Sequence, residues 1–270
     1  MKITFLGGGN MANALIGGMV KQGFAASDIT VVDPGMEARA RLVESYGVRC
    51  FEAAGALDAV GDLLVLAVKP QQMKDAVAPL VGVLGQAVVV SIAAGLDLAA
   101  LSRFLGGHRK IVRCMPNTPA LIGAGITGLC ALPEVDDAGR AAADRVLSAV
   151  GSTLWIADEG KMDGVTAISG SGPAYVFLFI EALQQAAADL GFTPEQGRQL
   201  AIETVQGAAA LAAQSSEPAS VLRERVTSKG GTTEAALRTM GEHGVKEGVI
   251  AGVMAAEARG AELGKLLGSA

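Results

Sequence analysis

A glycine turn near the start of the chain limits the folds that it can adopt. A short apolar run, Ile3–Leu6, leads directly into Gly7-Gly8-Gly9-Asn10-Met11-Ala12 and then into a helix-forming stretch. The spacing G-x-G-x-x-A is typical of the turn that binds the diphosphate of a dinucleotide. Gly7 permits the tight turn, Gly9 lets the backbone approach the diphosphate, and the following helix supplies amide donors and the positive end of its dipole. The alternative interpretation is a glycine turn with a purely structural role.

The first 160 residues alternate short β-branched runs with alanine-rich stretches. We predict strands at 2–6, 29–33, 63–68, 87–92 and 110–115, and helices at 10–22, 34–46 and 70–84. Most of these strands are apolar throughout, as are parallel strands that are covered on both faces. The alternation predicts an α/β fold in which residues 1–160 form a Rossmann-type, doubly wound dinucleotide-binding domain.

Beyond about Lys161 no strand pattern remains. We predict helices at 173–190, from the capping box at 193–196 to about residue 213, and at 245–267, with Ser216 and Thr232 capping two shorter helices. Several of these helices are apolar around much of their circumference, as Val176-Phe177-Leu178-Phe179-Ile180 shows. Such helices need neighbours on several sides. We therefore expect residues 161–270 to form an all-helical substrate and dimerisation domain, through which the chain forms a homodimer or a larger homo-oligomer.

Composition narrows the class of protein further. The net charge of −5 argues against a nucleic-acid partner. Three scattered cysteines and two histidines do not fit a disulfide scaffold or a Cys/His zinc cluster, so no metal is expected. The uncharged stretch 76–96 is long enough to cross a membrane, but it contains Pro79, Gly82 and Gly85 before the strand-like Val88-Val89-Val90. We interpret it as a helix end, a turn and a buried strand, and expect a cytoplasmic protein without a membrane segment or an export signal.

Polar residues follow several of the predicted strands. Asp33 ends the second strand, where an acidic residue normally binds the ribose 2′-hydroxyl of NAD. Arg39 and Arg41 follow on the next helix and are candidates for a 2′-phosphate, so the choice between NAD and NADP stays open. Because the carboxyl ends of parallel strands line the ligand site, three further segments are candidates for cofactor contacts: Lys69-Pro70, Ala94-Gly95 and Asn117.

A second candidate site lies in the helical half, at Thr227-Ser228-Lys229-Gly230-Gly231-Thr232-Thr233. Four hydroxyls surround a pair of glycines just before a predicted helix. The glycines open the backbone to a ligand and the helix N-terminus offers free amides, so the segment suits a small carboxylate. An ordinary helix cap is the competing interpretation.

Taken together, these motifs resemble pyrroline-5-carboxylate reductases over essentially the whole chain. The resemblance rests on the segments at 5–12, 67–70, 91–95, 113–119 and 169–175, and above all on the family signature at 226–240. It implies hydride transfer from NADPH, with NADH as a possible substitute, to the C=N carbon of L-1-pyrroline-5-carboxylate, giving L-proline.

The resemblance also implies roles for individual residues. Cofactor contacts are expected from Leu6, Gly7, Gly9, Asn10, Met11, Asp33, Lys69, Pro70, Ala94, Gly95 and Asn117. The substrate carboxylate is expected at Ser228, Gly231 and Thr232, while Thr233 matches the proposed proton donor to the ring nitrogen. Two other interpretations remain open: a β-hydroxyacid dehydrogenase, whose catalytic lysine is replaced here by Val176, and a non-catalytic NADP-sensing module.

Overall fold

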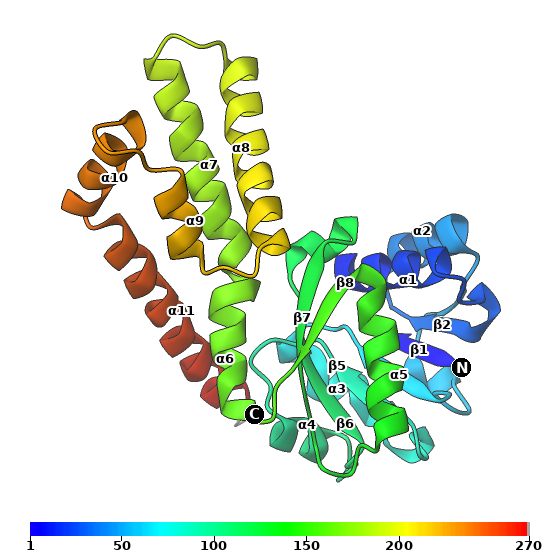
Figure 1. The fold of residues 1–270 in the computed structure, drawn as a ribbon. Helices are drawn as coiled ribbons and strands as arrows, with labels where there is room; N and C mark the ends of the chain where they lie inside the picture. Colours follow the sequence, from blue (N-terminus) through cyan, green and yellow to red (C-terminus); the bar gives the residue numbers. More distant parts are fainter. Residues whose placement is uncertain (269–270) are drawn as a thin grey trace. The chain divides into compact units, whose positions relative to one another are not determined.

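The computed structural model describes residues 1–268, which divide into two compact units (Figure 1). Unit 1 contains Met1–Ser171 and, of the later described residues, 256–268, and unit 2 contains Gly172–Ala255. The domain boundary predicted at residue 160 lies eleven positions before the end of the first segment of unit 1 (171 − 160), and it stays a prediction.

Unit 1 is built around one sheet of eight strands with the order β3-β2-β1-β4-β5-β6-β7-β8. Its strands are β1 (Ile3–Leu6), β2 (Ile29–Val32), β3 (Arg49–Phe51), β4 (Leu63–Leu66), β5 (Val88–Ser91), β6 (Ile111–Met115), β7 (Gly125–Ala131) and β8 (Gly151–Trp155). All neighbouring pairs are parallel except β6 and β7. In register, Leu6 lies opposite Val32 on one side and Leu66 on the other, so the carboxyl ends of β2, β1 and β4 are level.

Helices cover both faces of this sheet, which confirms the doubly wound prediction (Figure 1). On one face α1 (Asn10–Lys21), α2 (Met36–Tyr46) and α5 (Asp137–Leu147) pack against inward residues such as Phe5 and Val65. On the other face α3 (Met73–Val77) and α4 (Leu98–Phe104) pack against the alternate residues of the same strands, such as Leu6 and Leu64. Strands that are buried on both faces explain the uninterrupted apolar runs in the sequence.

Two predictions about unit 1 were incomplete. The strands β3, β7 and β8 were not predicted, because β3 is only three residues long and because β7 contains Gly125 and Gly128, which weaken the strand signal. The predicted helix at 70–84 is α-helical only at Met73–Val77 and continues as a 3-10 helix at Ala78–Val83, where Pro79 lacks an amide hydrogen. The uncharged stretch 76–96 therefore contains the end of α3, a 3-10 helix, a turn and the buried strand β5, as the sequence analysis proposed.

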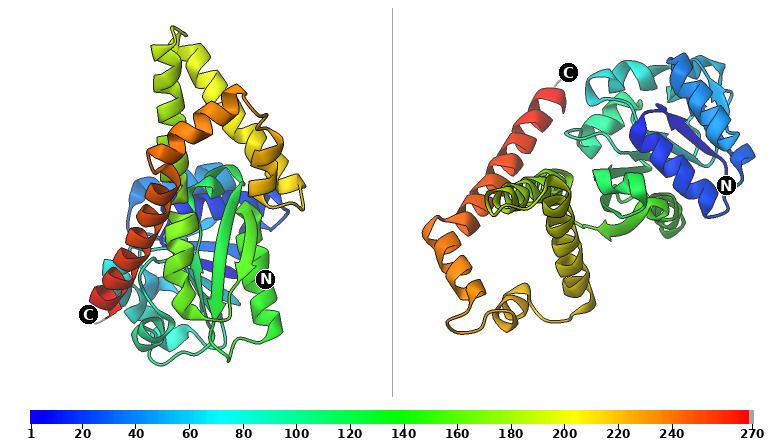
Figure 2. Two further views of the ribbon diagram at one scale, coloured as in Figure 1. Left: turned by 60° about the vertical axis from the view of Figure 1, so that its left-hand side comes forward. Right: turned by 90° about the horizontal axis from the view of Figure 1, so that it is seen from above.

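Unit 2 contains only helices: α7 (Gly172–Asp189), α8 (Pro194–Gln214), α9 (Ala219–Arg225), α10 (Thr232–Glu242) and the first part of α11 (Val245–Gly268). The long helices α7 and α8 run side by side as an antiparallel pair (Figure 2). The predicted capping box is present, with the Thr193 side chain accepting a hydrogen bond from the Gln196 amide. The predicted caps at Ser216 and Thr232 were wrong, because the residues before α9 and α10 are Pro218 and Gly231.

The stretch Glu159–Asp189 is long and apolar enough, with a mean hydropathy of 1.3, to pass a length-and-composition test for a membrane span. It is the one such stretch in the part of the chain that the structure describes, and 6% of the tested window is buried. Exposed apolar side chains also occur on the other helices of unit 2, among them Leu200, Val249 and Met254.

Candidate active site

The glycine turn after β1 has the geometry that a bound diphosphate requires. Gly7 has a φ of +103°, and a Cβ added there would lie 2.6 Å from the carbonyl oxygen of Ala67. Only glycine therefore fits between the turn and the end of β4. At Gly9 an added Cβ would meet no atom within 4 Å, so the backbone borders open space. Gly9 is the N-cap of α1 and provides no side-chain cap, which leaves the amides of the first turn available to an anion.

A cavity of about 690 Å³ lies beside this turn. Among the predicted cofactor residues, those that line it are Leu6, Gly7, Gly9, Asp33 and Lys69. The lining also includes residues that sequence reasoning missed: Glu52, Ala54, Gln71, Gln72 and Asp75. Glu52 directly follows β3, and recognising that short strand would have placed Glu52 at the same edge of the sheet. An open glycine turn, a helix N-terminus without a side-chain cap and an adjoining cavity together fit a dinucleotide.

Asp33 is tied to the glycine turn. One carboxylate oxygen accepts a hydrogen bond from the Gly8 amide at 2.6 Å, and the other accepts from the Gly35 amide at 2.7 Å. The side chain therefore links the end of β2 to the β1–α1 turn. Asp33 also lines the cavity, and its carboxylate has lone pairs beyond those that the two amides use.

The two arginines that follow Asp33 in the sequence form hydrogen bonds with backbone carbonyls, and one of them also pairs with Glu52. Arg39 donates to the carbonyl oxygens of Asp33 and Pro34 at 2.7 and 2.8 Å, and it forms an ion pair with Glu52 at 3.5 Å. Arg41 donates to the Gly8 carbonyl oxygen at 3.2 Å. Neither arginine is among the described residues that line the cavity.

The other predicted cofactor residues lie at the expected strand ends. Pro70 is the first residue of a 3-10 turn after β4, and Gly95, with a φ of +78°, follows β5. Asn117, after β6, is buried: its side-chain oxygen accepts from the Ile126 amide at 3.0 Å, and its nitrogen donates to the Ser169 carbonyl at 3.3 Å. Asn117 thus joins β7 to the π-helical turn at Thr166–Gly170. Its contact with the nicotinamide stays a prediction. The cofactor contacts of Asn10, Met11, Pro70, Ala94 and Gly95 also stay predictions, and these residues are not among those that line this cavity.

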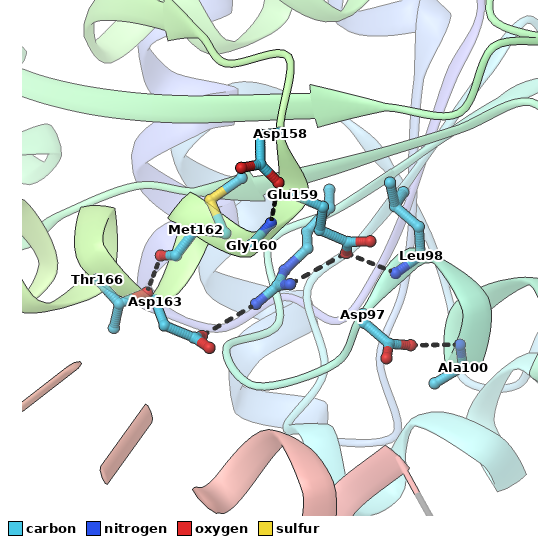
Figure 3. A network of polar contacts seen from close by, with 10 residues as sticks. Asp97, Leu98, Ala100, Asp158, Glu159, Gly160, Met162, Asp163 and Thr166 are labelled. Atoms are coloured by element: carbon cyan, nitrogen blue, oxygen red, sulfur yellow. Dashed lines mark hydrogen bonds and ion pairs between the residues drawn. The ribbon is translucent and has the colours of Figure 1, made fainter. Parts of the chain in front are cut away.

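A buried ionic network, not predicted from the sequence, joins β6 to the segment that contains Glu159 and Asp163 (Figure 3). Arg113, whose side chain is 8% exposed, contacts Glu159 at 3.0 Å and Asp163 at 3.5 Å. The same Glu159 oxygen accepts from the Leu98 amide at 2.8 Å, at the start of α4. Because these partners come from distant segments, the network fixes the start of α4 and of α6 (Met162–Val165) against the sheet.

The predicted substrate segment in unit 2 forms an exposed turn between α9 and α10. Gly230 has a φ of +73°, and its amide donates to the Glu234 carboxylate at 2.7 Å. Gly231 is the N-cap of α10 and supplies no side-chain cap, so the first amides of that helix have no side-chain acceptor at the cap. In the described part of the chain, the hydroxyls of Ser228, Thr232 and Thr233 form no hydrogen bond. These groups and the amides together suit a carboxylate.

Neither candidate site contains a histidine. The ring of His108 contacts the Ala87 carbonyl at 2.9 Å and that of His243 contacts the Thr239 carbonyl at 2.9 Å. Within the described residues no group of three or more His, Cys, Asp or Glu side chains is arranged to hold a metal ion.

Comparisons with known proteins agree with this geometry. Residues 159–263 match the family described as pyrroline-5-carboxylate reductase dimerisation, and residues 2–95 match that described as NADP oxidoreductase coenzyme F420-dependent. The pyrroline-5-carboxylate reductase of Pseudomonas aeruginosa is 44% identical and covers 99% of this chain and 98% of its own length. The solved reductase of Coxiella burnetii is 38% identical with a TM-score of 0.91, covering 97% of this chain and 98% of its own. The Plasmodium falciparum pyrroline carboxylate reductase, solved with NADP bound, is 29% identical with a TM-score of 0.87 and covers 98% of both chains.

A doubly wound sheet with an open glycine turn and an adjoining cavity indicates dinucleotide binding. Together with the match of residues 2–95 to the NADP oxidoreductase family, it defines a dinucleotide-dependent oxidoreductase. The full-length match at 44% identity with the Pseudomonas aeruginosa reductase identifies the family within this class. The chain belongs to the pyrroline-5-carboxylate reductase family.

Proposed function

We propose that this chain reduces L-1-pyrroline-5-carboxylate to L-proline, with NADPH as the reductant and NADH as an accepted substitute. The observation that carries the proposal is the full-length family match, together with an open glycine turn in unit 1 and a hydroxyl-rich turn in unit 2. NADP is bound in the related Plasmodium structure, which supports the choice of cofactor.

The chain's own residues bind the cofactor through backbone groups. Gly7 and Gly9 shape the diphosphate turn, and the amides of Asn10 and Met11 donate from the start of α1. Lys69 adds a positive charge in the cavity. In this proposal Pro70, Ala94 and Gly95 border the cofactor, with Asn117 nearby. When bound, the reduced nicotinamide supplies the hydride.

Unit 2 binds the substrate in this proposal. The Ser228 and Thr232 hydroxyls and the backbone at Gly231 hold the carboxylate at the N-terminus of α10, where the helix dipole favours an anion. The uncapped amides need little rearrangement, because their helical geometry is already set. Such binding orients the ring so that its C=N carbon can accept hydride from the reductant.

The Thr233 hydroxyl hydrogen-bonds the ring nitrogen in this proposal: it donates to the lone pair of the neutral imine and relays the proton that this nitrogen takes up. A hydroxyl is a weak acid, and a carbonyl reductase needs a stronger donor for its developing alkoxide. A cyclic imine differs, because its protonated form is already an electrophile near neutral pH. Orientation and the exclusion of water then provide most of the rate acceleration.

The apolar surface of unit 2 supports a homodimer formed through the C-terminal helices. Phe177, Leu178 and Phe179 are all exposed on α7, which lies in the segment that matches the dimerisation family. Burying such side chains against a second copy removes apolar area from water. A cytoplasmic location is part of the same proposal, because Cys50, Cys114 and Cys130 are free thiols.

Steady-state oxidation of NADPH and of NADH, each with L-1-pyrroline-5-carboxylate, tests the proposal. We expect substrate-dependent oxidation with both reductants and the formation of one proline for each reductant consumed. Oxidation that does not depend on the imine, or the absence of proline among the products, contradicts the proposed reaction.

A further inference from the structure

We propose that Glu234 is a positioning residue for the substrate: its carboxylate fixes the turn formed by residues 228–231 against α10, and so keeps the Ser228 hydroxyl at the N-terminus of that helix. This inference rests on the proposed function, because the 228–231 turn belongs to the proposed substrate segment. Glu234 acts through the Gly230 amide and does not itself contact the substrate.

The 228–231 turn is closed by a backbone hydrogen bond but contains two adjacent glycines. Gly230 has a φ of +73°, and the Gly231 amide donates to the Ser228 carbonyl oxygen at 3.0 Å. A Cβ added at Gly231 would lie 3.0 Å from the same oxygen, so a side chain there would crowd the closed turn. Glycine has more conformational freedom to lose than any other residue, and two in succession give the free turn many alternative shapes. The observed shape therefore needs support from outside the turn.

Glu234 supplies this support from the first turn of α10. It is the third residue of the helix, and its carboxylate accepts a hydrogen bond from the Gly230 amide at 2.7 Å. In a capping box, a Glu at this position binds the amide of the N-cap residue. Here the N-cap is Gly231, so Glu234 reaches one residue further back along the chain. The hydrogen bond ties the middle of the turn to the helix that is proposed to bind the substrate carboxylate.

The start of the turn is held separately, by α9. The amide and the hydroxyl of Thr227 donate to the carbonyl oxygens of Glu224 and Arg223, at 3.0 and 2.6 Å. Thr227 directly precedes the turn. Loss of the Glu234 contact therefore loosens the turn against α10 while its start stays attached to α9, and the Ser228 hydroxyl is no longer held at the N-terminus of α10.

The reach and the charge of Glu234 have opposite effects on an anionic substrate. Its negative charge lies in the same helical turn that is proposed to bind the substrate carboxylate, so the charge itself opposes binding. Because Glu234 is exposed, solvent and salt screen this repulsion. A glutamine side chain keeps the length and an acceptor oxygen without the charge. An aspartate side chain keeps the charge but is one carbon shorter, so the two substitutions separate reach from charge.

The test compares Glu234→Asp, Glu234→Gln and Glu234→Ala with the unaltered protein. The matched control is Glu242→Asp, which makes the same change at an exposed position at the other end of α10, where Glu242 pairs with Arg238. For each protein we measure the KM for the imine, kcat and the dissociation constant of NADPH. Calorimetric titration with NADP⁺ present gives the dissociation constant of L-proline, which reports carboxylate binding without turnover.

We expect Glu234→Asp and Glu234→Ala to raise the KM for the imine and the dissociation constant of L-proline about fivefold or more, which corresponds to about 1 kcal/mol. Saturating substrate orders the turn again, so kcat should change little, and the dissociation constant of NADPH should stay constant. Glu234→Gln should restore substrate binding to that of the unaltered protein, and the control should match it as well.

A KM for the imine that is unchanged in Glu234→Asp and Glu234→Ala, or an equal rise in Glu234→Gln, overturns the proposal. A joint loss of kcat and NADPH affinity also overturns it, because it would indicate damage beyond the turn. If Glu234→Ala does not fold, Glu234→Asp and Glu234→Gln decide, since both side chains suit the first turn of a helix. The expected order of L-proline affinities in a protein that makes no proline would contradict the proposed reaction and leave this inference intact.

Discussion

Replacing two glycines of the β1–α1 turn by alanine, one at a time, should have two different effects. The change at Gly7 should lower the stability of the fold, and the change at Gly9 should lower the affinity for NADPH. At Gly7 the φ of +103° is one that alanine rarely adopts, and its Cβ would lie 2.6 and 2.8 Å from the carbonyl oxygen and carbon of Ala67. The backbone strain is about 1–3 kcal/mol. Overpacking against an immobile strand end adds about 1–3 kcal/mol. The sum of about 2–6 kcal/mol is a large part of a typical stability of about 5–15 kcal/mol.

At Gly9 the same substitution should leave the fold intact. Its φ of −68° suits alanine, and the added Cβ meets no atom within 4 Å. The change at the helix N-cap and the lower entropy of the unfolded chain are opposite effects, each below about 1 kcal/mol. The methyl group instead occupies space next to the bound diphosphate. A steric cost of about 1–3 kcal/mol in the complex corresponds to a loss of affinity of about 5- to 150-fold.

Thermal unfolding followed by circular dichroism and titration with NADPH separate the two effects. We expect Gly7→Ala to lower the melting temperature by about 5–20 °C, from about 2–4 °C per kcal/mol in a chain of this size. We expect Gly9→Ala to melt close to the unaltered protein and to bind NADPH weakly. Normal NADPH affinity in Gly9→Ala would refute the placement of the diphosphate, and normal melting of Gly7→Ala would refute the steric argument at Ala67.

Four further substitutions or treatments test other parts of the account. Ser228→Ala should raise the KM for the imine about 10- to 150-fold, since a hydrogen bond to a charged group contributes about 1.5–3 kcal/mol, while the dissociation constant of NADPH stays constant. Thr233→Ala should lower kcat by about 100-fold, the lower end of what a general acid contributes, and Thr233→Ser should restore it. Glu159→Gln should lower the free energy of unfolding in urea by about 1–3 kcal/mol, because it leaves the buried Arg113 guanidinium with a weaker partner. The 29% exposure of the Glu159 side chain keeps the loss in this range. Burial raises the pKa of the Cys114 thiol well above its usual range, so iodoacetamide should modify Cys114 only after unfolding.

Each of these predictions has a clear contrary result. Collapse of NADPH affinity in Ser228→Ala would place that hydroxyl on the cofactor, and unchanged kcat in Thr233→Ala would refute the proton role. Glu134→Gln, which alters the exposed pair with Arg109, is the control for Glu159→Gln, and equal effects would contradict the importance of burial. The raised pKa of Cys114 also has a definite sign. The native state keeps a proton that the unfolded state loses, so stability should fall as the pH rises above the unfolded thiol's pKa.

Local signals predicted the first strand, the glycine turn and α1, because turn geometry and helix capping depend on neighbouring residues. The capping box at Thr193 was predicted for the same reason. β7 was not predicted because Gly125 and Gly128 weaken its local strand signal, and the strand is fixed instead by pairing with β6 and β8. Likewise, the 3-10 continuation after α3 follows from Pro79, whose effect was underestimated in an otherwise helical pattern.

In the candidate site too, features that depend on neighbouring residues were predicted and features that depend on distant residues were not. The place of Asp33 at the end of a strand was predictable from spacing, but its hydrogen bond to the Gly8 amide joins residues 25 positions apart. The partners of Arg113 lie 46 and 50 positions away, and no local pattern indicates which carboxylates a buried guanidinium will meet. Glu52 and Asp75 were missed because the strand before Glu52 is short and the helix that carries Asp75 is irregular.

Isotope transfer tests the proposed reaction most directly. The enzyme is incubated with L-1-pyrroline-5-carboxylate and NADPH that carries deuterium at the C4 position of the nicotinamide, on either face in separate experiments, and the proline is analysed by mass spectrometry and NMR. The account predicts one deuterium at C5 of L-proline from one of the two labelled forms. Proline without deuterium from both forms, or no proline at all, would contradict direct hydride transfer to the imine carbon.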